Sequence, residues 1–176
     1  MATDWIEIDA QVPRYEFDLV SKQFDSPQAR LRALLEAIEY APRPTLVYTT
    51  LVEEAESLYE ILRAEKGYRR IGLVTGESSL PGSRQEVVEQ WTQDALDLVI
   101  ATSAFGMGID KADVRTVIHA CVPESAARYY QEIGRGGRDG RQVIALCLWW
   151  KHGGRDFRYR DDDLGFAYRL DDRQWL

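Results

Sequence analysis

Five short apolar runs recur along the chain, and their alternation with helical patterns limits the folds that the sequence can adopt. Nearly every position in each run is apolar, as in strands that are covered on both faces of a sheet. The sequence therefore predicts an α/β fold of three layers, in which a mostly parallel sheet lies between helices. The runs are TLVYT at 45–49, IGLVT at 71–75, DLVIAT at 97–102, RTVIHA at 115–120 and QVIALCLWW at 142–150.

Helix start signals stand between these runs. A serine or threonine before an amphipathic segment can cap its first turn, and a glutamate three residues later completes a capping box. Proline is favoured at the first helical position. The signals are Ser26 with Pro27, Thr50 with Glu53, Ser83 with Glu86, and Ser125 before a helix that reaches Glu132.

The runs and helices define one predicted domain at residues 26–150, which is large enough for a hydrophobic core. Residues 1–25 are expected to form a lead-in or linker. Residues 151–176 are polar, contain scattered aromatic side chains and show no clear period, so they form a C-terminal extension without an assigned fold. Ligands of parallel sheets bind beyond the carboxyl ends of strands, so we expect the functional loops to share one edge.

Charge is distributed unevenly along the chain, whose formal net charge is −7. Residues 128–160 hold eight Lys/Arg and three Asp/Glu, a local charge of +5. Residues 161–176 hold two against five, which leaves −9 for residues 1–127. Phosphate binding depends on the local patch rather than on the net charge. We therefore expect this chain alone to bind nucleic acid weakly and with strong salt dependence.

Other features are typical of an intracellular protein. No apolar run is long enough to cross a bilayer, and the N-terminal segment lacks the layout of a signal peptide. Cys121 and Cys147 lie in apolar runs and are expected to be buried thiols rather than a disulfide or metal ligands. His119 is expected to be a core histidine. We expect a cytoplasmic location, no membrane partner and no metal site in this chain.

Residues 129–141, YYQEIGRGGRDGR, combine arginine with glycine after a predicted helix. Arg135 and Arg138 stand three apart among four glycines. The arginine fork suits phosphate oxygens, and glycine lets the backbone approach a ligand closely. Upstream, residues 101–119 place a Gly-Met-Gly turn between two apolar strands. Together these segments point to a polyphosphate ligand, and an exposed Arg/Gly loop without that role is the alternative.

The segments ATSAFGMGID and QEIGRGGRDG resemble motifs V and VI of superfamily 2 helicases, in the form carried by the RecQ family. The resemblance extends over roughly residues 30–150. It implies the second, C-terminal RecA-like domain of an ATP-dependent DNA helicase or translocase. By this resemblance, ATP would lie between this domain and an N-terminal RecA-like domain of the same protein. Both domains would hold single-stranded or partly duplex DNA.

The resemblance assigns roles in a composite ATP site. Arg135 and Arg138 would reach the phosphates, with Arg138 as the arginine finger. Gln131 would couple the nucleotide state to domain closure. A turn or a helix cap is the alternative role of the acidic residue in motif V. The further nucleotide-site residues that the resemblance implies are Gly106, Gly108 and Asp110.

The resemblance also implies contacts with nucleic-acid phosphates at strand ends. Motif IV is a weaker match, because residues 50–52 replace the Asn-Ser-Arg-like triplet that is common in the family. Hydroxyls at strand ends can instead satisfy their own backbone, and an arginine at a helix start can be solvated. The implied nucleic-acid-binding residues are Thr49, Thr50, Arg84, Thr102 and Ser103.

Two motifs of a complete ATPase are missing from this sequence. It contains neither a GxxxxGK[ST] phosphate loop nor a DExH-type acidic motif to hold Mg²⁺. ATP and Mg²⁺ would therefore be held mainly by the N-terminal domain, and this chain alone is expected to be inactive. Two alternatives stay open, namely a non-catalytic nucleic-acid or protein-binding module with a helicase fold, and an RNA helicase domain.

Overall fold

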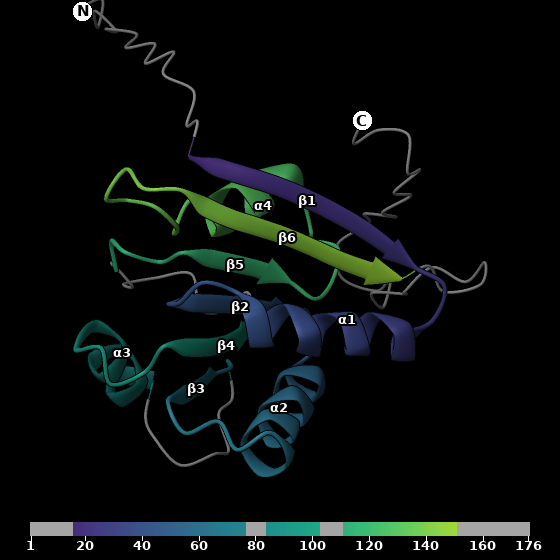
Figure 1. The fold of residues 1–176 in the computed structure, drawn as a ribbon, viewed down its shortest axis with the longest axis horizontal. Coiled ribbons are helices and arrows are strands. Elements are labelled where there is room, and N and C mark those ends of the chain that lie inside the picture. Colours follow the sequence, from purple (N-terminus) through teal and green to yellow (C-terminus); the bar gives the residue numbers. More distant parts are fainter. Residues whose placement is uncertain (1–15, 77–83, 103–110, 151–176) are drawn as a thin grey trace, which may run out of the picture.

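The computed structural model describes residues 16–76, 84–102 and 111–150. The described strands form one six-stranded sheet in the order β1-β6-β5-β2-β4-β3, and every strand pair is parallel (Figure 1). The strands are β1 (Phe17–Phe24), β2 (Thr45–Thr49), β3 (Ile71–Val74), β4 (Leu98–Thr102), β5 (Thr116–His119) and β6 (Val143–Trp150). The helices are α1 (Pro27–Tyr40), α2 (Val52–Glu60) with its π-helical continuation η1 (Ile61–Glu65), α3 (Arg84–Thr92) and α4 (Ala126–Ile133).

Each of the five apolar runs contains a strand of this sheet. Every residue of β2, β3, β4 and β5 is buried. A strand can bury all its positions only when both faces of the sheet are covered. The α/β expectation with a parallel sheet is therefore confirmed.

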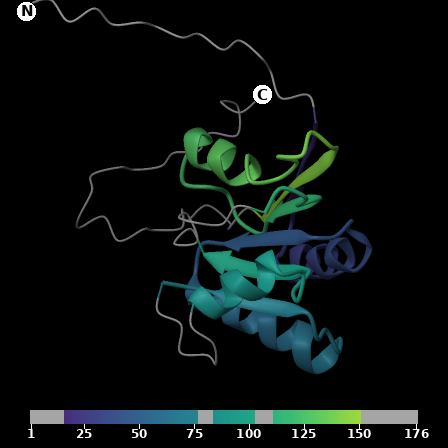
Figure 2. The ribbon, with the colours of Figure 1, turned by 90° about the vertical axis from the view of Figure 1, so that its left-hand side faces the viewer.

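Helices cover the two faces of the sheet, which gives three layers (Figure 2). Helices α1 and α2 contribute Ile38 and Ala55 to the core on one face. Helices α3 and α4 contribute Trp91 and Ile133 to the core on the other face. Full burial of a large apolar side chain contributes about 1.5–3 kcal/mol, so both layers stabilise the sheet. Among the described helices, none has the length and apolar character needed to cross a membrane.

Two serines cap their helices as the sequence predicts. The Oγ of Ser26 accepts from the Ala29 N–H at 3.1 Å, at the start of α1. The Oγ of Ser125 accepts from the Arg128 N–H at 3.1 Å, at the start of α4. Each bond satisfies one of the backbone donors that a helix leaves free in its first turn.

The capping box expected at Thr50 and Glu53 is wrong. The residue in the cap position is Leu51, which makes no side-chain cap bond. The chain is still extended there, with φ −98° and ψ 140°, and the Thr49 hydroxyl donates to the Leu51 carbonyl at 3.0 Å. Helix α2 therefore begins at Val52. The second expected box depends on Ser83, which lies outside the described residues.

Strand β1 lies before residue 26, where the sequence places the start of the domain. It pairs with β6 along its whole length, with Phe17 opposite Val143 and Phe24 opposite Trp150. Only the two phenylalanines at its ends are partly buried, and the six residues between them are exposed. An edge strand of this kind has no apolar run, so the pattern that reveals the inner strands does not reveal it.

Cys121 and Cys147 are free thiols, as expected. The Cys147 thiol donates to the Cys121 carbonyl at 3.7 Å, and the Cys121 thiol donates to the Tyr48 carbonyl at 3.9 Å. Burial raises the pKa of Cys121 to about 12 and that of Cys147 to about 11. Both side chains are therefore thiols and not thiolates at neutral pH.

The packing of β1 can be tested at one of its partly buried end positions and at one of its exposed positions. We expect Phe24→Ala to lower the free energy of unfolding by about 1–2 kcal/mol, because its ring packs against the core under α1 and α2. The matched control is Leu19→Ala on the same strand, because Leu19 is 59% exposed. The control should change stability by about 0.5 kcal/mol or less. Urea unfolding followed by circular dichroism measures both, and equal losses would contradict this packing of β1.

Candidate functional site

The arginine-glycine segment forms a compact loop after helix α4. The helix ends at Ile133, whose carbonyl accepts from the Gly136 N–H at 2.9 Å. Gly137 has φ +60°, a left-handed conformation that glycine adopts without strain. A Cβ added there would lie 2.6 Å from a methyl of Val143 and 2.7 Å from the carbonyl oxygen of Arg141. The loop therefore requires glycine at this position.

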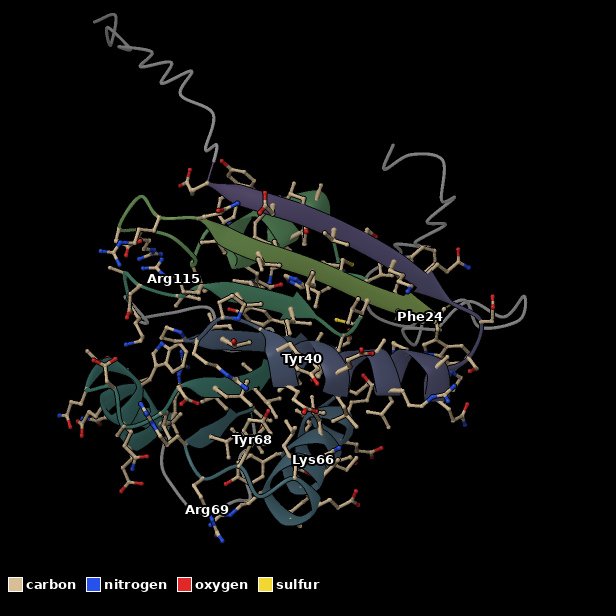
Figure 3. All side chains as sticks on the ribbon, viewed as in Figure 1. Phe24, Tyr40, Lys66, Tyr68, Arg69 and Arg115 are labelled. Atoms are coloured by element: carbon tan, nitrogen blue, oxygen red, sulfur yellow. The ribbon has the colours of Figure 1, made fainter. Side chains whose placement is uncertain are left out.

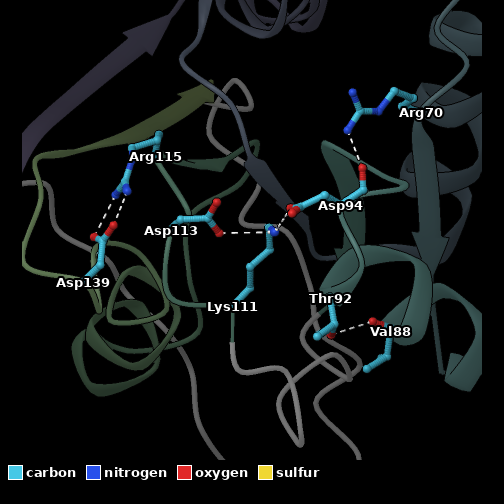
Figure 4. A network of polar contacts seen from close by, with 8 residues as sticks. All are labelled: Arg70, Val88, Thr92, Asp94, Lys111, Asp113, Arg115 and Asp139. Carbon is cyan, nitrogen blue, oxygen red and sulfur yellow. Dashed lines mark hydrogen bonds and ion pairs between the residues drawn. The ribbon is translucent and has the colours of Figure 1, made fainter.

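Hydrogen bonds hold this loop against the segment that precedes β5. The Gly137 N–H donates to the Val114 carbonyl at 3.1 Å, and the Asp139 N–H donates to the Ala112 carbonyl at 3.2 Å. The Arg115 guanidinium donates to both carboxylate oxygens of Asp139, to one of them at 3.0 Å (Figure 4). These bonds from Arg115 hold the pKa of Asp139 down at about 2. The loop is thus fixed by its backbone and by a two-pronged ion pair.

This contact places the arginine loop at the amino-terminal edge of β5. The expectation that the functional loops share the carboxyl edge is therefore wrong for the loop of Arg135 and Arg138. Helix α4 begins after the carboxyl end of β5 and runs back along the sheet, so the residues after its last turn arrive at the opposite edge. Figure 3 shows the two edges, with Arg115 at the amino-terminal one and Phe24 at the carboxyl one.

The two arginines of the loop differ in their surroundings. Arg138 is exposed, and its Nε donates to the Gly134 carbonyl at 3.5 Å. Arg135 is half-buried and lies near Tyr48 of β2. Burial raises the pKa of the Tyr48 phenol, and the positive charge of Arg135 opposes that rise. Gln131 is exposed on α4. Arg138 and Gln131 therefore face solvent, whereas Arg135 lies partly against the sheet.

Three of the predicted nucleic-acid contacts, Thr49, Thr50 and Thr102, lie at the carboxyl edge. Thr49 and Thr102 end the adjacent strands β2 and β4 and stand opposite each other in the ladder. Both are buried, and the Thr49 hydroxyl is engaged with the Leu51 carbonyl. Thr50 is half-buried after β2, and Arg84 is exposed at the start of α3. The predicted residues that lie outside the described ranges are Ser103, Gly106, Gly108 and Asp110.

The first turn of α2 at this edge is acidic. Glu54 is paired with Arg30 of α1 at 3.1 Å, and Glu53 is exposed. Both glutamates line a groove between α1 and α2, together with Thr49. Negative charge at a helix amino terminus stabilises the helix, but it also repels a phosphate at the same place. The described part of this edge is therefore a poor anion site.

Lys111, which sequence reasoning did not single out, anchors the chain just before β5. Its ammonium bonds to Asp94 and lies 3.2 Å from Asp113 (Figure 4). The same ammonium lies 5.5 Å from the ring centroid of Trp91. Burial alone would lower the pKa of Lys111, but the hydrogen bonds to Asp94 and Asp113 outweigh it and raise the pKa. A buried lysine that pairs with two carboxylates fixes the chain before β5 in place. No local sequence pattern predicts this role.

The core histidine predicted at position 119 is confirmed, and it has a buried acidic partner. His119 is 0% exposed, and its Nε2 lies 2.8 Å from the Oε2 of Glu132 on α4. The two residues are too far apart in sequence for a local pattern to pair them. Across the described ranges, no group of three His, Cys, Asp or Glu side chains is placed to hold a metal ion.

The ion pair of Asp139 predicts a defined pH dependence. Its folded-state pKa of about 2 lies below the ordinary 3.8, so the pair contributes stability that is present above pH 4 and is lost as the pH falls through 2. We expect Asp139→Asn to unfold at lower urea than the unmodified chain at pH 7, with the difference vanishing towards pH 2. The control is Asp25→Asn, which removes an exposed carboxylate before α1. A pH-independent difference for Asp139→Asn would contradict the ion pair.

The sequence of this chain is similar to those of known helicases. Residues 29–140 match the family described as the helicase conserved C-terminal domain. The ATP-dependent DNA helicase RecQ of Bacillus subtilis (strain 168) is 44% identical over 103 residues, which are 58% of this chain and 17% of that protein. The bifunctional 3'-5' exonuclease/ATP-dependent helicase WRN of Mus musculus is 40% identical over 107 residues, 60% of this chain and 7% of that protein. The chain thus spans less than a fifth of the length of either relative.

A solved structure shares the fold. It is the E. coli DEAD-box protein SrmB bound to regulator of ribonuclease activity A, with a TM-score of 0.66 and 25% sequence identity. The match covers 80% of this chain and 79% of that chain. The sheet and its helices are therefore RecA-like, as the resemblance implied. Because the family match covers more than half of the chain and includes the anchored arginine loop, this chain belongs to the helicase conserved C-terminal domain family, with RecQ-type DNA helicases among its relatives.

Proposed function

We propose that this chain is the C-terminal motor domain of a RecQ-like, ATP-dependent DNA helicase or translocase. In this proposal it completes an ATP site that an N-terminal RecA-like domain mainly holds. The observation that carries the proposal is the anchored loop that presents Arg138 exposed and Arg135 half-buried. The relatives described above from Bacillus subtilis and Mus musculus are ATP-dependent helicases, which supports the proposal. The motor domain comprises β1 and the elements within residues 26–150.

Arg138 acts as the arginine finger in this proposal. The loop that carries it is held by backbone bonds to residues 112–114, so its guanidinium can meet a phosphate without rearrangement of the loop. Negative charge develops on the phosphate oxygens during transfer, and a donor already in place stabilises it without a reorganisation cost. Arg135 donates to a neighbouring phosphate, and Gln131 couples the nucleotide state to domain closure.

Mg²⁺ would neutralise part of the phosphate charge when it is bound with the nucleotide. The described residues offer no cluster of ligands for it, so the facing domain supplies them in this proposal. Gly106, Gly108 and Asp110 complete the nucleotide contacts of this chain. Because a motor of this kind acts on DNA in the presence of ATP, a location inside the cell, in the cytoplasm, is part of this proposal.

Single-stranded or partly duplex DNA would bind at the carboxyl edge. Thr49, Thr50 and Thr102 lie at this edge, and Arg84 is an exposed cation at the start of α3. Ser103 follows directly as a further phosphate contact in the proposal. In this proposal the arginine loop and the DNA contacts of Thr49, Thr50 and Thr102 lie at opposite edges of one sheet.

An RNA helicase domain is the second candidate. It is favoured by the structural likeness to SrmB, a DEAD-box protein. That likeness comes with 25% identity, whereas the DNA helicase RecQ of Bacillus subtilis is 44% identical over its matched residues. The sequence similarity therefore favours DNA over RNA, and the fold alone is common to both classes.

The finger assignment predicts the effect of one substitution. In the protein that joins this domain to an N-terminal RecA-like domain, we expect Arg138→Ala to lower DNA-stimulated ATP turnover about 10³-fold, because the charge on the leaving phosphate loses its donor. The control is Arg141→Ala, which removes an equal charge from a side chain that is 79% exposed in the same loop region. Turnover is measured with and without single-stranded DNA and, separately, RNA.

The outcomes separate the alternatives. Near-normal turnover in Arg138→Ala would remove the finger assignment. Stimulation by RNA alone would transfer the proposal to the RNA helicase class. A folded, unmodified two-domain protein without any turnover would favour a non-catalytic binding module.

The acidic first turn of α2 predicts that negative charge at the carboxyl edge lowers the affinity of this chain for DNA. We expect Glu53→Gln to tighten binding of a fluorescent single-stranded oligonucleotide about two- to fivefold at low salt, because a charge that repels phosphate is removed near a helix amino terminus. The control is Glu60→Gln, an exposed residue at the other end of the same helix. Anisotropy titrations measure both, and equal effects would mean that only net charge matters.

A further inference from the structure

A buried polar pair joins β5 to the last turn of α4. His119 on β5 is 0% exposed, and Glu132 on α4 is 6% exposed. The Nε2 of His119 and the Oε2 of Glu132 are 2.8 Å apart. Arg128, one turn earlier on α4, donates from its Nε to the Oε1 of Glu132 at 3.0 Å. Both carboxylate oxygens of Glu132 are therefore engaged, one by the sheet and one by its own helix.

Such a pair is a costly way to pack a helix on a sheet. A carboxylate loses several kcal/mol of hydration on burial unless its partners replace it, and an apolar pair of similar volume has no such penalty. What a hydrogen-bonded pair adds is direction, because its distance and angle are satisfied only in a narrow range. The pair at His119 and Glu132 thus fixes the rotation and the height of α4 on β5.

Two aromatic rings enclose the imidazole of this pair. The Tyr48 ring of β2 stacks on the His119 imidazole, with centroids 5.2 Å apart and 21° between the planes. Tyr129 of α4 meets the imidazole edge-on, with centroids 5.0 Å apart. The Arg135 N–H donates to the Glu132 carbonyl at 3.3 Å. The side chain of Glu132 is thus held by the sheet, and its backbone holds the start of the segment that carries Arg135.

Arg138 has a different support. The backbone on either side of it is bonded to residues 112–114, through Gly137 and Asp139, and Arg115 pairs with Asp139. These bonds fix the far part of the loop, whereas Arg135 follows α4 by two residues and depends on how that helix sits. The backbone around Arg138 thus rests on residues 112–114, although its side chain also reaches the end of α4 through the Gly134 carbonyl.

We propose that His119 and Glu132 are positioning residues for Arg135. They hold the end of α4 on β5, and this sets where the chain leaves the helix and so where Arg135 can meet a nucleotide phosphate. The identity of that ligand rests on the proposed function. The support of Arg135 is a property of this chain alone, so it can be tested without ATP.

The first experiment observes the arginine side chains of the 176-residue chain by nitrogen–proton correlation NMR of their Nε–Hε groups. In Glu132→Ala we expect the Arg135 signal to shift and broaden and the Arg138 signal to shift much less, because the backbone on either side of Arg138 is held by residues 112–114. In Glu132→Gln we expect a smaller shift, because the amide keeps one of the two hydrogen bonds. Glu132→Gln keeps the side-chain volume, so it provides the test if the alanine variant does not fold.

The matched control is Glu54→Gln, which weakens another glutamate–arginine pair, with Arg30, on the opposite face of the sheet. It should leave the Arg135 signal unchanged. An unchanged Arg135 signal in folded Glu132→Gln would overturn the proposal. An equal shift of the Arg135 and Arg138 signals would also overturn it, because it would indicate general loosening of the loop.

The second experiment is a double-mutant cycle on ATP turnover in the two-domain protein. We expect Glu132→Gln to lower kcat about tenfold to a hundredfold with little change in KM for ATP, as for a displaced catalytic group. In an Arg135→Ala background the same substitution should have no further effect on kcat. A loss of equal size in both backgrounds would mean a merely structural role and would overturn the proposal.

The NMR experiment can fail or succeed independently of the proposed function. A two-domain protein without turnover would remove the helicase proposal, and the NMR experiment on this chain would still decide whether Glu132 positions Arg135. A shifted Arg135 signal in a catalytically silent protein would support the positioning role and leave the ligand of Arg135 to be reassigned.

Discussion

Parallel pairing of every described strand decides where the loops of this domain lie. In a parallel sheet the chain leaves each strand at the carboxyl edge and must return to the amino edge before the next strand begins. Residues before a crossover helix and residues after it are thereby kept at opposite edges. Thr49 and Thr102 end strands and lie at one edge, whereas Arg135 and Arg138 follow α4 and lie at the other.

Ion pairs between distant segments then make the amino-terminal edge firm. Arg115 joins Asp139 across the start of β5, and the ammonium of Lys111 joins Asp94 and Asp113. Exposed pairs contribute little to stability, but the side chains of Lys111 and Arg115 are mostly buried, so packing as well as charge holds these two cations in place. A firm edge suits a residue such as Arg138, whose proposed role needs a donor that does not move during the reaction.

The inner strands could be predicted from sequence because they are apolar at nearly every position, a pattern typical of burial on both faces of a sheet. Strand β1 could not, because an edge strand with six exposed residues has no such pattern. The start of α2 differs from the one that the capping preference of Thr50 predicts. The chain is still extended at Leu51, where the Thr49 hydroxyl donates to the Leu51 carbonyl. The resemblance points to the arginine loop. The edge of the sheet at which that loop lies depends on the direction of α4, which no local pattern gives. The pairing of His119 with Glu132 likewise depends on tertiary packing.

The pairing of β1 with β6 also has a mechanical consequence. The two strands run in the same direction, with Phe17 opposite Val143 and Phe24 opposite Trp150. The chain therefore enters this pair at one edge of the sheet and leaves it at the other. A force that pulls the preceding residues away from the following ones loads all the hydrogen bonds of the ladder at once, in shear, instead of opening them one by one. Unfolding the domain by tension along the chain would thus require the hydrogen bonds between β1 and β6 to break together.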